Sequence, residues 1–227
     1  MIILALDTAL TACSVAVLDT DQGVLTAQES MPMTRGHAES LMPMVARVME
    51  QAHLEFVEID RIAVTTGPGS FTGLRVGIAA ARGMALAAAK PAVGLSTLAA
   101  FAAPHIATDD TVPVVAVIDA RHDHVYFQVF GPGGRTLVTP RISSIPDAVR
   151  SIGKRVPRIV GSAADLMMAA WPANEPPPLT VDPRLDPDIE WVARLGAAVP
   201  EGQAPPKPLY LRAPDAQPQD AARLPRR

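Results

Sequence analysis

Residues 2–30, IILALDTALTACSVAVLDTDQGVLTAQES, decide the fold that we expect of this chain. Three strand-like runs, at 2–7, 12–19 and 23–30, are separated by short polar turns, and the second run alternates and becomes rich in β-branched residues towards its end. Short strands that are joined by tight turns pair with their neighbours in antiparallel order. The stretch therefore predicts an antiparallel meander of three strands.

After the meander the pattern changes to helices and strands in alternation. A helical pattern at 38–52 is followed by a strand at 61–65, a glycine-rich turn and a long helix at 71–89. A strand at 92–95 and a helix that begins near Ser96, a favoured N-cap residue, complete this half. A meander that leads into alternating helices and strands predicts a mixed sheet with helices on its faces.

The second half of the chain repeats this order of elements. We expect strands at 113–119, 124–130 and 135–139, a helix at 146–152, a strand at 158–161, a helix at 162–170, a strand at 179–181 and a helix at 186–199. Both halves thus read strand-strand-strand-helix-strand-helix-strand-helix, and two such units side by side leave a cleft between them.

The repeated order predicts the fold class, which is α/β with a duplicated actin-like fold of the ASKHA or RNase H-like type. We place the N-terminal unit at 1–105 and the C-terminal unit at 106–212. The last helix of the second unit could pack back on the first. Prolines concentrate late in the chain, and we expect residues 213–227 to form an extended or disordered tail.

The composition of the 227 residues narrows the function classes. The formal charge is −3 and there is no lysine-rich tract, so we expect any contact with RNA to run through a complex. The single cysteine, Cys13, excludes an internal disulfide and a Cys-based zinc site. No basic region precedes the first apolar residues, and no run is long enough to span a bilayer, so we expect a cytoplasmic protein with no membrane contact.

Two aspartates at strand ends are candidate nucleotide or phosphate positions. Asp7 and Thr8 lie at the end of the first strand, and Asp119 ends the matching strand of the second unit. A phosphate needs accessible backbone N–H groups and small side chains, whereas neither 9–11 nor 120–124 contains glycine. We therefore interpret Asp7, Thr8 and Asp119 as vestigial positions without a catalytic role, or as ordinary turn residues.

The histidines after Asp119 do not predict a metal site. His122 and His124 would share one face of a strand, with Asp119 and Asp123 close by. A metal site would need a further ligand, and the sequence has no second cluster of His and Asp residues. An exposed hairpin tip explains the same residues, so we predict no metal ligand.

The segment 65–77, TTGPGSFTGLRVG, is the most distinctive of the chain. Its glycine spacing is that of neither a Walker loop nor a dinucleotide-binding motif. Anion binding at the start of the following helix stays open. The simpler explanation is a tight turn whose glycines let the helix pack closely on the sheet, with Ser70 or Thr72 as its N-cap.

The helices at 38–52 and 71–89, both in the first unit, are more apolar than a surface helix requires. Two explanations stay open. Both helices are interior, or their surplus apolar surface binds a partner, for which methionine-rich surfaces are suited. We favour the second, and the predicted interface residues are Met42, Ala46, Met49, Leu74, Arg75, Ile78, Ala81, Arg82 and Ala85.

With these residues laid out, the sequence resembles the TsaB (YeaZ) family. The matching pieces are LALDTALTACSVAVL at 4–18, GHAESLMPMV at 36–45, GPGSFTGLRVGIAAARGMALA at 67–87, DARHDHVYFQVF at 119–130 and PLYLRAPDA at 208–216. The long glycine-rich piece is the most specific of them. The resemblance spans most of the chain, although residues 140–205 add little to it.

The resemblance implies a non-catalytic dimerisation subunit of the bacterial machinery for tRNA threonylcarbamoyladenosine (t6A). Such a chain pairs with a TsaD-type subunit, which transfers threonylcarbamoyl to N6 of the adenosine beside the anticodon, and a TsaE-type ATPase joins them. Alone, it is expected to form a homodimer. The metal and ATP or ADP are expected on the partners, with no cofactor of its own and only indirect contact with tRNA.

Two other function classes remain. A free-standing actin-like ATPase or phosphotransferase is the main alternative, and the glycine-poor turn after Asp119 argues against it. A peptidase is the weaker one, because the sequence contains no G-x-S-x-G elbow.

Overall fold

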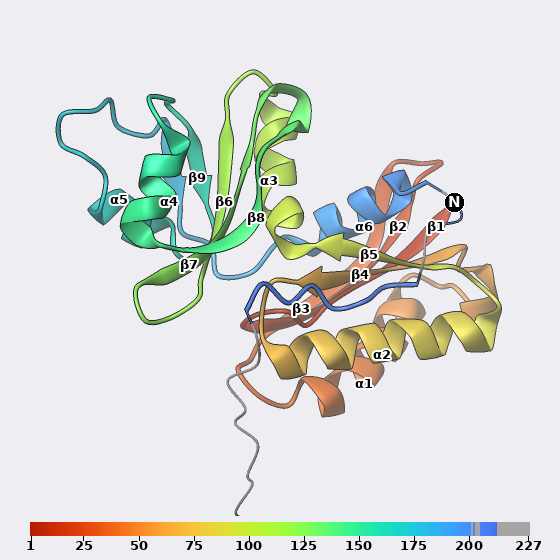
Figure 1. The fold of residues 1–227 in the computed structure, drawn as a ribbon. Helices are drawn as coiled ribbons and strands as arrows, with labels where there is room; N and C mark the ends of the chain where they lie inside the picture. Colours follow the sequence, from red (N-terminus) through yellow and green to blue (C-terminus); the bar gives the residue numbers. More distant parts are fainter. Residues whose placement is uncertain (201, 203–204, 213–227) are drawn as a thin grey trace, which may run out of the picture.

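Two five-stranded sheets form the framework of the molecule in the computed structural model, which describes residues 1–200, 202 and 205–212 (Figure 1). The strands of the N-terminal sheet are β1 (Ile2–Asp7), β2 (Ala12–Asp19), β3 (Val24–Pro32), β4 (Arg61–Gly67) and β5 (Ala92–Ser96). They lie in the order β3-β2-β1-β4-β5. The first three are antiparallel, and β4 and β5 run parallel to β1.

The C-terminal sheet has the same topology. Its strands are β6 (Val114–Asp119), β7 (His124–Phe130), β8 (Thr136–Ser144), β9 (Arg158–Val160) and β10 (Thr180–Asp182), in the order β8-β7-β6-β9-β10. Here too the first three strands are antiparallel and the last two run parallel to the central strand. The duplicated α/β fold predicted from the sequence is thereby confirmed.

Successive side chains along a strand point to opposite faces of its sheet, and both faces of each sheet are covered by helices. The helices are α1 (His37–Gln51), η1 (Phe56–Glu58), α2 (Phe71–Ala88), α3 (Thr97–Thr108), η2 (Pro132–Gly134), α4 (Ile145–Ile152), α5 (Ala164–Ala169) and α6 (Ile189–Ala198). One face of the N-terminal sheet is covered by α1 and α2. The corresponding face of the C-terminal sheet is covered by α4 and α5.

The last helix of each unit packs on the sheet of the other unit. Leu98 and Phe101 of α3 are fully buried in a cluster with residues of β6 and β7. In return, Ile189 and Val192 of α6 are buried with residues of β1, β2, β4 and β5. The far face of each sheet is therefore covered by a helix that belongs, in sequence, to the other half.

Two details differ from the sequence-based expectation. The strand expected at 135–139 continues to Ser144, past Pro140, because β8 is an edge strand, where proline removes no ladder hydrogen bond. The boundary expected between residues 105 and 106 lies within α3, which ends at Thr108. The division into 1–105 and 106–212 stays a prediction, and the tail expected at 213–227 lies outside the described residues.

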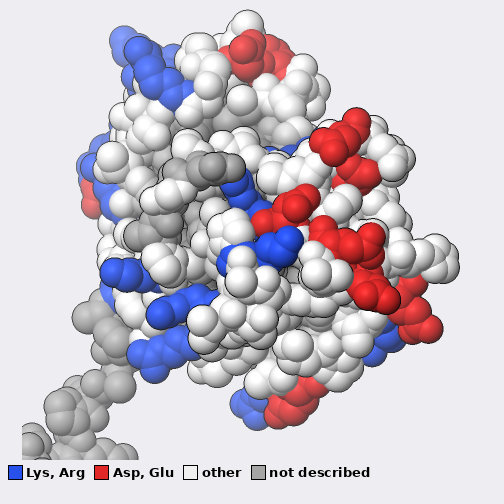
Figure 2. Space-filling view, turned by 90° about the vertical axis from the view of Figure 1, so that its right-hand side faces the viewer, with Lys and Arg blue, Asp and Glu red and all other residues white. Residues whose placement is uncertain are grey.

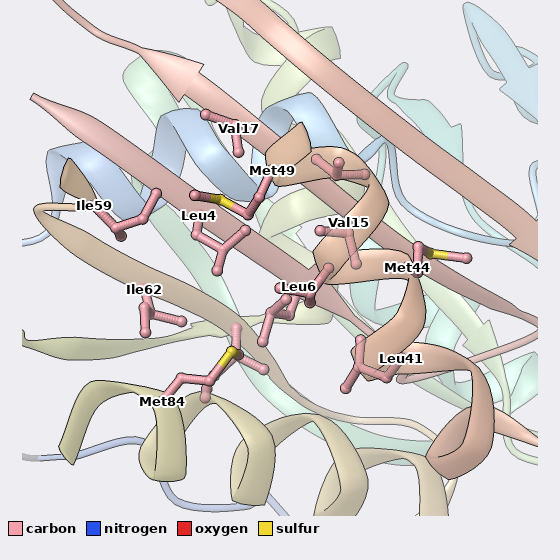
Figure 3. Close-up of a cluster of buried hydrophobic side chains, with 14 of the residues drawn as sticks. Leu4, Leu6, Val15, Val17, Leu41, Met44, Met49, Ile59, Ile62 and Met84 are labelled. Atoms are coloured by element: carbon pink, nitrogen blue, oxygen red, sulfur yellow. The ribbon is translucent and has the colours of Figure 1, made fainter. Parts of the chain in front are cut away.

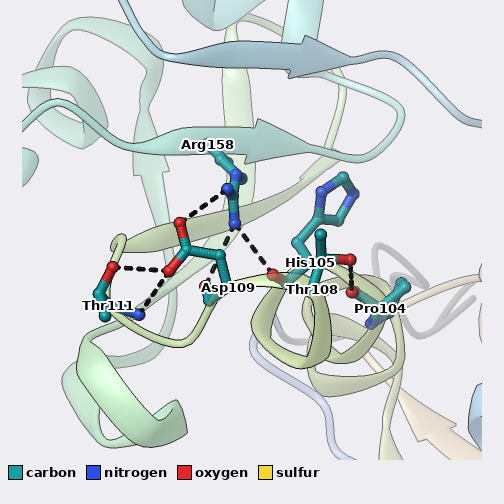
Figure 4. Close-up of polar contacts among 6 residues, drawn as sticks. All are labelled: Pro104, His105, Thr108, Asp109, Thr111 and Arg158. Atoms are coloured by element: carbon teal, nitrogen blue, oxygen red, sulfur yellow. Dashed lines mark hydrogen bonds and ion pairs between the residues drawn. The ribbon is translucent and has the colours of Figure 1, made fainter.

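A polar cluster secures the connection between α3 and β6 (Figure 4). Arg158, at the start of β9, donates from Nη1 to the carbonyl oxygens of His105 (3.1 Å) and Asp109 (3.2 Å), and from Nη2 to the Asp109 carboxylate (3.1 Å). The hydroxyl and amide of Thr111 also donate to Asp109, and these bonds, with Arg158, lower the pKa of that carboxyl. The cluster satisfies carbonyl groups that the end of α3 leaves without helical partners.

Charged side chains are unevenly distributed over the face of the molecule that Figure 2 shows. Acidic side chains gather on one side of this face and basic side chains lie mainly on the other. Near the start of the chain, the Met1 amine lies 2.9 Å from the Asp21 carboxylate, and the Ile2 amide donates to the Asp60 carboxylate.

Among the described residues, no helix is both long enough and apolar enough to cross a bilayer.

Candidate functional site

The inner faces of α1 and α2 build the core of the N-terminal unit (Figure 3). Leu41 and Met44 of α1 and Met84 of α2 point towards the sheet and are buried against Leu4 and Leu6 of β1. An apolar stripe at helical spacing needs only one face for such packing. The opposite faces of the two helices are therefore available to something outside the unit.

The predicted interface residues fall into two groups. Five of them are buried in the folded N-terminal unit, although Met49 also lines the groove described below: Met49, Leu74, Ile78, Ala81 and Ala85. The wide apolar arc that suggested them includes the face that packs within the chain. The others are exposed, namely Met42, Ala46, Arg75 and Arg82. The interface itself stays a prediction.

An apolar groove of about 370 Å³ lies between the two helices. It is lined by Met42, Val45, Ala46, Met49, Phe56, Met84 and Ala87. Met42, which lines the groove, is 48% exposed, and Leu86 of α2 is 85% exposed. Leu86 was not among the predicted interface residues. It lies four residues after the predicted residue Arg82, on the same side of α2, and this spacing is the signal that could have found it.

The start of α2 is joined by a segment from the end of the described chain. The Arg75 guanidinium lies 3.8 Å from the centre of the Phe71 ring, and its Nε donates to the hydroxyl of Tyr210 (3.1 Å). The Tyr210 ring lies 5.0 Å from that of Phe71, and the Leu209 amide donates to the carbonyl of Thr66 (2.8 Å). Tyr210 thereby adds an aromatic side chain, 41% exposed, to the outer side of α2.

Three glycines of the distinctive segment lie against the turn that follows β1. A Cβ on Gly69 or Gly73 would collide with the carbonyl oxygen of Ala9 or Thr8, and one on Gly77 would lie 2.5 Å from the Thr8 hydroxyl oxygen. Ser70 is the N-cap and accepts from the Gly73 amide (3.3 Å). The close packing expected of this segment is confirmed, and the start of α2 lies against Thr8 and Ala9 of the turn after β1.

Asp7 is fully buried in the N-terminal unit. Its Oδ1 accepts from the amide of Ala9 (3.1 Å) and from the hydroxyl of Thr65, and its Oδ2 has no hydrogen-bond partner among the described residues. Burial, with a smaller contribution from the charge of Asp186, raises the pKa of this carboxyl to about 6 against the opposing effect of both hydrogen bonds. Thr8 is also buried and donates to the carbonyl of Gly73 (2.7 Å).

Asp119 occupies the matching place in the C-terminal unit but is exposed. Its Oδ1 accepts from the amide of Arg121 (2.7 Å), and its own amide donates to the Ser162 hydroxyl (3.1 Å). Arg121, His122 and Asp123 all have positive φ, at 63°, 52° and 57°. A left-handed backbone costs a residue with a side chain about 1–2 kcal/mol. These three residues, whose side chains argue against a phosphate loop, thus adopt the left-handed backbone conformation that glycine usually provides.

A cleft of about 700 Å³ separates the two units. Leu10, Thr11, Ser70 and Phe71 line it from the N-terminal unit, and Asp119, Arg121, His122, Tyr126 and Ser162 line it from the C-terminal unit. Asp119 therefore faces the cleft, whereas Asp7 and Thr8 are enclosed in the N-terminal core. The fold does not bring the three suspected phosphate positions together as one exposed site.

The histidines of the β6–β7 turn bond to the turn itself. His124 Nδ1 lies 2.6 Å from the carbonyl oxygen of His122. No group of three or more His, Cys, Asp or Glu side chains with the geometry of a metal site occurs within the described part of the chain.

Comparison with known proteins finds a family model and relatives whose names refer to tRNA modification. A family model described as TsaD, tRNA N6-adenosine threonylcarbamoyltransferase, matches residues 31–165. The tRNA threonylcarbamoyladenosine biosynthesis protein TsaB of Escherichia coli is 39% identical over 127 residues. That alignment covers 56% of this chain and 54% of the E. coli protein, so the chain matches about half the length of this relative.

Two further relatives match over almost the whole chain. An uncharacterized protein of Mycobacterium tuberculosis is 34% identical over 95% of this chain and 94% of its own length. The solved structure of YeaZ from Pseudomonas aeruginosa has a TM-score of 0.74 and 29% identity, and the match covers 92% of this chain and 99% of that one. The chain belongs to the TsaB (YeaZ) family.

Proposed function

We propose that this chain acts in t6A biosynthesis as a non-catalytic scaffold subunit in the cytoplasm. It pairs with a TsaD-type threonylcarbamoyltransferase, which modifies N6 of the adenosine beside the anticodon, and a TsaE-type ATPase joins the pair. In the absence of these partners it forms a homodimer. The names of the TsaB relatives and the match to the TsaD family model support this role.

The observation that carries the proposal is the apolar groove between α1 and α2. Met42, a large apolar side chain that lines this groove, is 48% exposed in the part of the chain that the structure describes. Exposed apolar grooves of this kind are typical of protein-binding sites, and methionine adapts to the shape of a partner. Arg75 and Arg82 on the same helix provide the arginines that interfaces favour.

The burial of Asp7 supports the non-catalytic part of the proposal. Asp7 is enclosed in the core, whereas Asp119 faces the cleft and accepts from the amide of its own turn. A general base must reach its substrate directly or through one water. We therefore assign ATP or ADP and the metal to the partner subunits, and contact with tRNA to the assembled complex.

The test is binding of a purified TsaD-type subunit to variants that carry an arginine in the groove or beside it. Ala46 lies in the groove, and Gly83 is exposed on α2 with open space where a Cβ would lie. Ala46→Arg and Gly83→Arg should each weaken binding by about tenfold or more, as at an interface hot spot. The matched control is Ala169→Arg, on the exposed side of α5 in the other unit.

Thermal melting shows whether each variant is folded. Folded groove variants that bind the TsaD-type subunit as tightly as the wild type would exclude this face as the interface. The alternative function, a free-standing ATPase or phosphotransferase, predicts that the isolated chain hydrolyses ATP and gains nothing from a TsaD-type partner. Turnover by the purified chain alone would replace the scaffold proposal with that alternative.

A further inference from the structure

Three methionines line the groove between α1 and α2, and one of them is accessible from solution. Met42 is 48% exposed, whereas Met49 and Met84, which line the same groove, are buried. The other lining side chains are apolar too: Val45, Ala46, Phe56 and Ala87. The groove therefore presents one accessible thioether in otherwise apolar surroundings.

The position of Met42 distinguishes it from the other exposed methionines. Met31 of β3 and Met168 of α5 are also exposed, but neither of them lines the groove or the cleft. Met44 of α1 and Met167 of α5 are fully buried. A dissolved oxidant reacts with a thioether that it can reach, so these three exposed methionines are its first targets. Of the three, Met42 is the one whose oxidation would change the groove.

The only cysteine of the chain does not compete for the oxidant. Cys13 lies in β2 and is fully buried. Burial, with smaller contributions from the carboxylates of Asp7 and Glu29, raises the pKa of its thiol to about 11. The thiolate is the form that reacts with peroxide, so this thiol is inert at neutral pH. Exposed methionines are therefore the sulfur groups of this chain that peroxide oxidises.

We infer that Met42 is a site of reversible oxidation, and that its sulfoxide prevents a partner from occupying the groove. The oxidant is hydrogen peroxide. Its O–O bond breaks, an S–O bond forms as the thioether loses two electrons, and the departing hydroxide takes up a proton to leave as water. Methionine sulfoxide reductases reverse the step: a pair of thiols becomes a disulfide, and the oxygen atom leaves as water. This inference rests on the proposed function, which makes the groove a partner site.

The groove offers a sulfoxide no hydrogen-bond donor. Its lining side chains are apolar, and the backbone amides at these positions of α1 and α2 bond within the helices. Water satisfies the sulfoxide oxygen while the groove is open. A partner surface that fits the apolar groove removes this water and leaves a buried acceptor unpaired, which is unfavourable. Oxidation should therefore weaken partner binding much more than it affects the free chain.

The test is oxidation of the purified chain with hydrogen peroxide, which catalase removes before a TsaD-type subunit is added. The chain is diluted so that its homodimer dissociates, and mass spectrometry of its peptides measures the sulfoxide at each methionine. Met42 should oxidise at least as fast as Met168. The oxidised chain should keep its circular dichroism spectrum but bind the TsaD-type subunit about tenfold more weakly or worse. Methionine sulfoxide reductases with dithiothreitol should restore the affinity.

Two results of this experiment would overturn the inference. One is unchanged affinity of a chain whose Met42 is mostly sulfoxide. The other is a Met42 that stays reduced while Met168 is oxidised, because the groove would then not be accessible to peroxide.

Two variants assign the effect to one sulfur atom. Met42→Leu has no sulfur at this position, so peroxide should change its own starting affinity by less than about twofold. The matched control is Met168→Leu, at a comparably exposed site in the other unit, which should lose affinity on oxidation as the wild type does. The reverse pattern would place the sensitive methionine outside the groove and overturn the inference.

A protection experiment separates this inference from the function on which it rests. When the TsaD-type subunit is bound before peroxide is added, oxidation of Met42 should slow severalfold and that of Met168 should not change. Equal oxidation of Met42 in the intact complex would exclude the groove as the interface, and the proposed function would fail together with the inference. Protection of Met42 with undiminished binding by the oxidised chain would support the proposed function and overturn only the inference.

Discussion

The two units share one topology but differ in the helices that cover their sheets. The N-terminal sheet carries α1 and α2, of 15 and 18 residues, whereas the C-terminal sheet carries α4 and α5, of 8 and 6 residues. The apolar groove is lined mainly by side chains of the two long helices. The short α5 also exposes apolar side chains, with Leu166 at 44% and Met168 at 40%.

The aspartates at the ends of β1 and β6 extend the comparison. In each unit the amide two residues further on donates to the carboxylate, from Ala9 to Asp7 and from Arg121 to Asp119. The local turn is thus the same, but Asp7 is fully buried and Asp119 faces the cleft. The duplicated position therefore differs in burial between the two units.

The largest expected effect tests whether the units are energetically independent. Phe101 of α3 is fully buried against the C-terminal sheet, and Phe101→Ala should lower the free energy of unfolding by about 3–5 kcal/mol. Because the units exchange their last helices, the whole chain should lose this stability. Leu166→Ala, at an exposed site on α5, should change it by about 0.5 kcal/mol or less.

Urea denaturation with single-tryptophan variants checks this prediction. Trp171→Phe leaves Trp191 of α6 as the probe of the N-terminal sheet, and Trp191→Phe leaves Trp171 as the probe of the C-terminal unit. Both probes should report the same lowered midpoint in the Phe101→Ala background. If one midpoint stayed at its wild-type value, the two units would be separate folding units.

A somewhat smaller effect distinguishes the two aspartates by pH. The folded-state pKa of Asp7, about 6, lies above the ordinary 3.8, so the folded protein binds this proton more tightly than the unfolded chain. This contribution is complete below pH 3.8, and it is lost as the pH rises through about 6, for a total of about 3 kcal/mol. Asp7→Asn should remove this decline. The measurement is the difference in unfolding free energy between wild type and variant from pH 4 to 7.

Asp119→Asn is the matched control in the other unit. It replaces the strand-end carboxylate at the matching position, which is exposed rather than buried. A decline that persists in Asp7→Asn would mean that another group causes it.

The smallest expected effect compares the inner and outer sides of α2. This helix is longer than the helices that cover the same face of the C-terminal sheet. Gly73→Ala places a Cβ against the Thr8 carbonyl oxygen and should cost about 1–3 kcal/mol. Gly83→Ala meets open space and should stabilise the chain by about 0.5–1 kcal/mol. Thermal melting of both variants checks the pair; equal shifts would contradict the assignment of the two sides.

The order of strands and helices could be predicted because each element shows its own period in the sequence. Ser70 and Ser96 even mark helix starts correctly. The sides of α2 could not be separated, because a stripe such as Ile78, Ala81 and Ala85 has the same composition whether it faces a sheet or a partner. The side chains of this stripe are buried because α2 packs closely on the sheet, and the glycines of α2 permit this close packing.

Contacts across the chain were beyond prediction for a different reason. The bond between Thr11 and Asp186 depends on α6 returning to the first sheet, and nothing local to either residue reports it. Tyr210 likewise reaches Phe71 only because residues 205–212 run along the N-terminal unit. Leu209 and Tyr210 belong to a piece that carries the family resemblance, but their place beside the start of α2 follows only from the folded chain.

The return of α6 to the first sheet has a consequence for synthesis of the protein. The far face of the N-terminal sheet, with Ile3, Ala5 and Ala63, is covered only after residues 189–198 have left the ribosome. Until then the nascent chain carries an uncovered apolar sheet, which is the kind of surface that chaperones bind. Contacts of such long sequence separation also slow folding. The N-terminal half therefore matures last in time although it is made first.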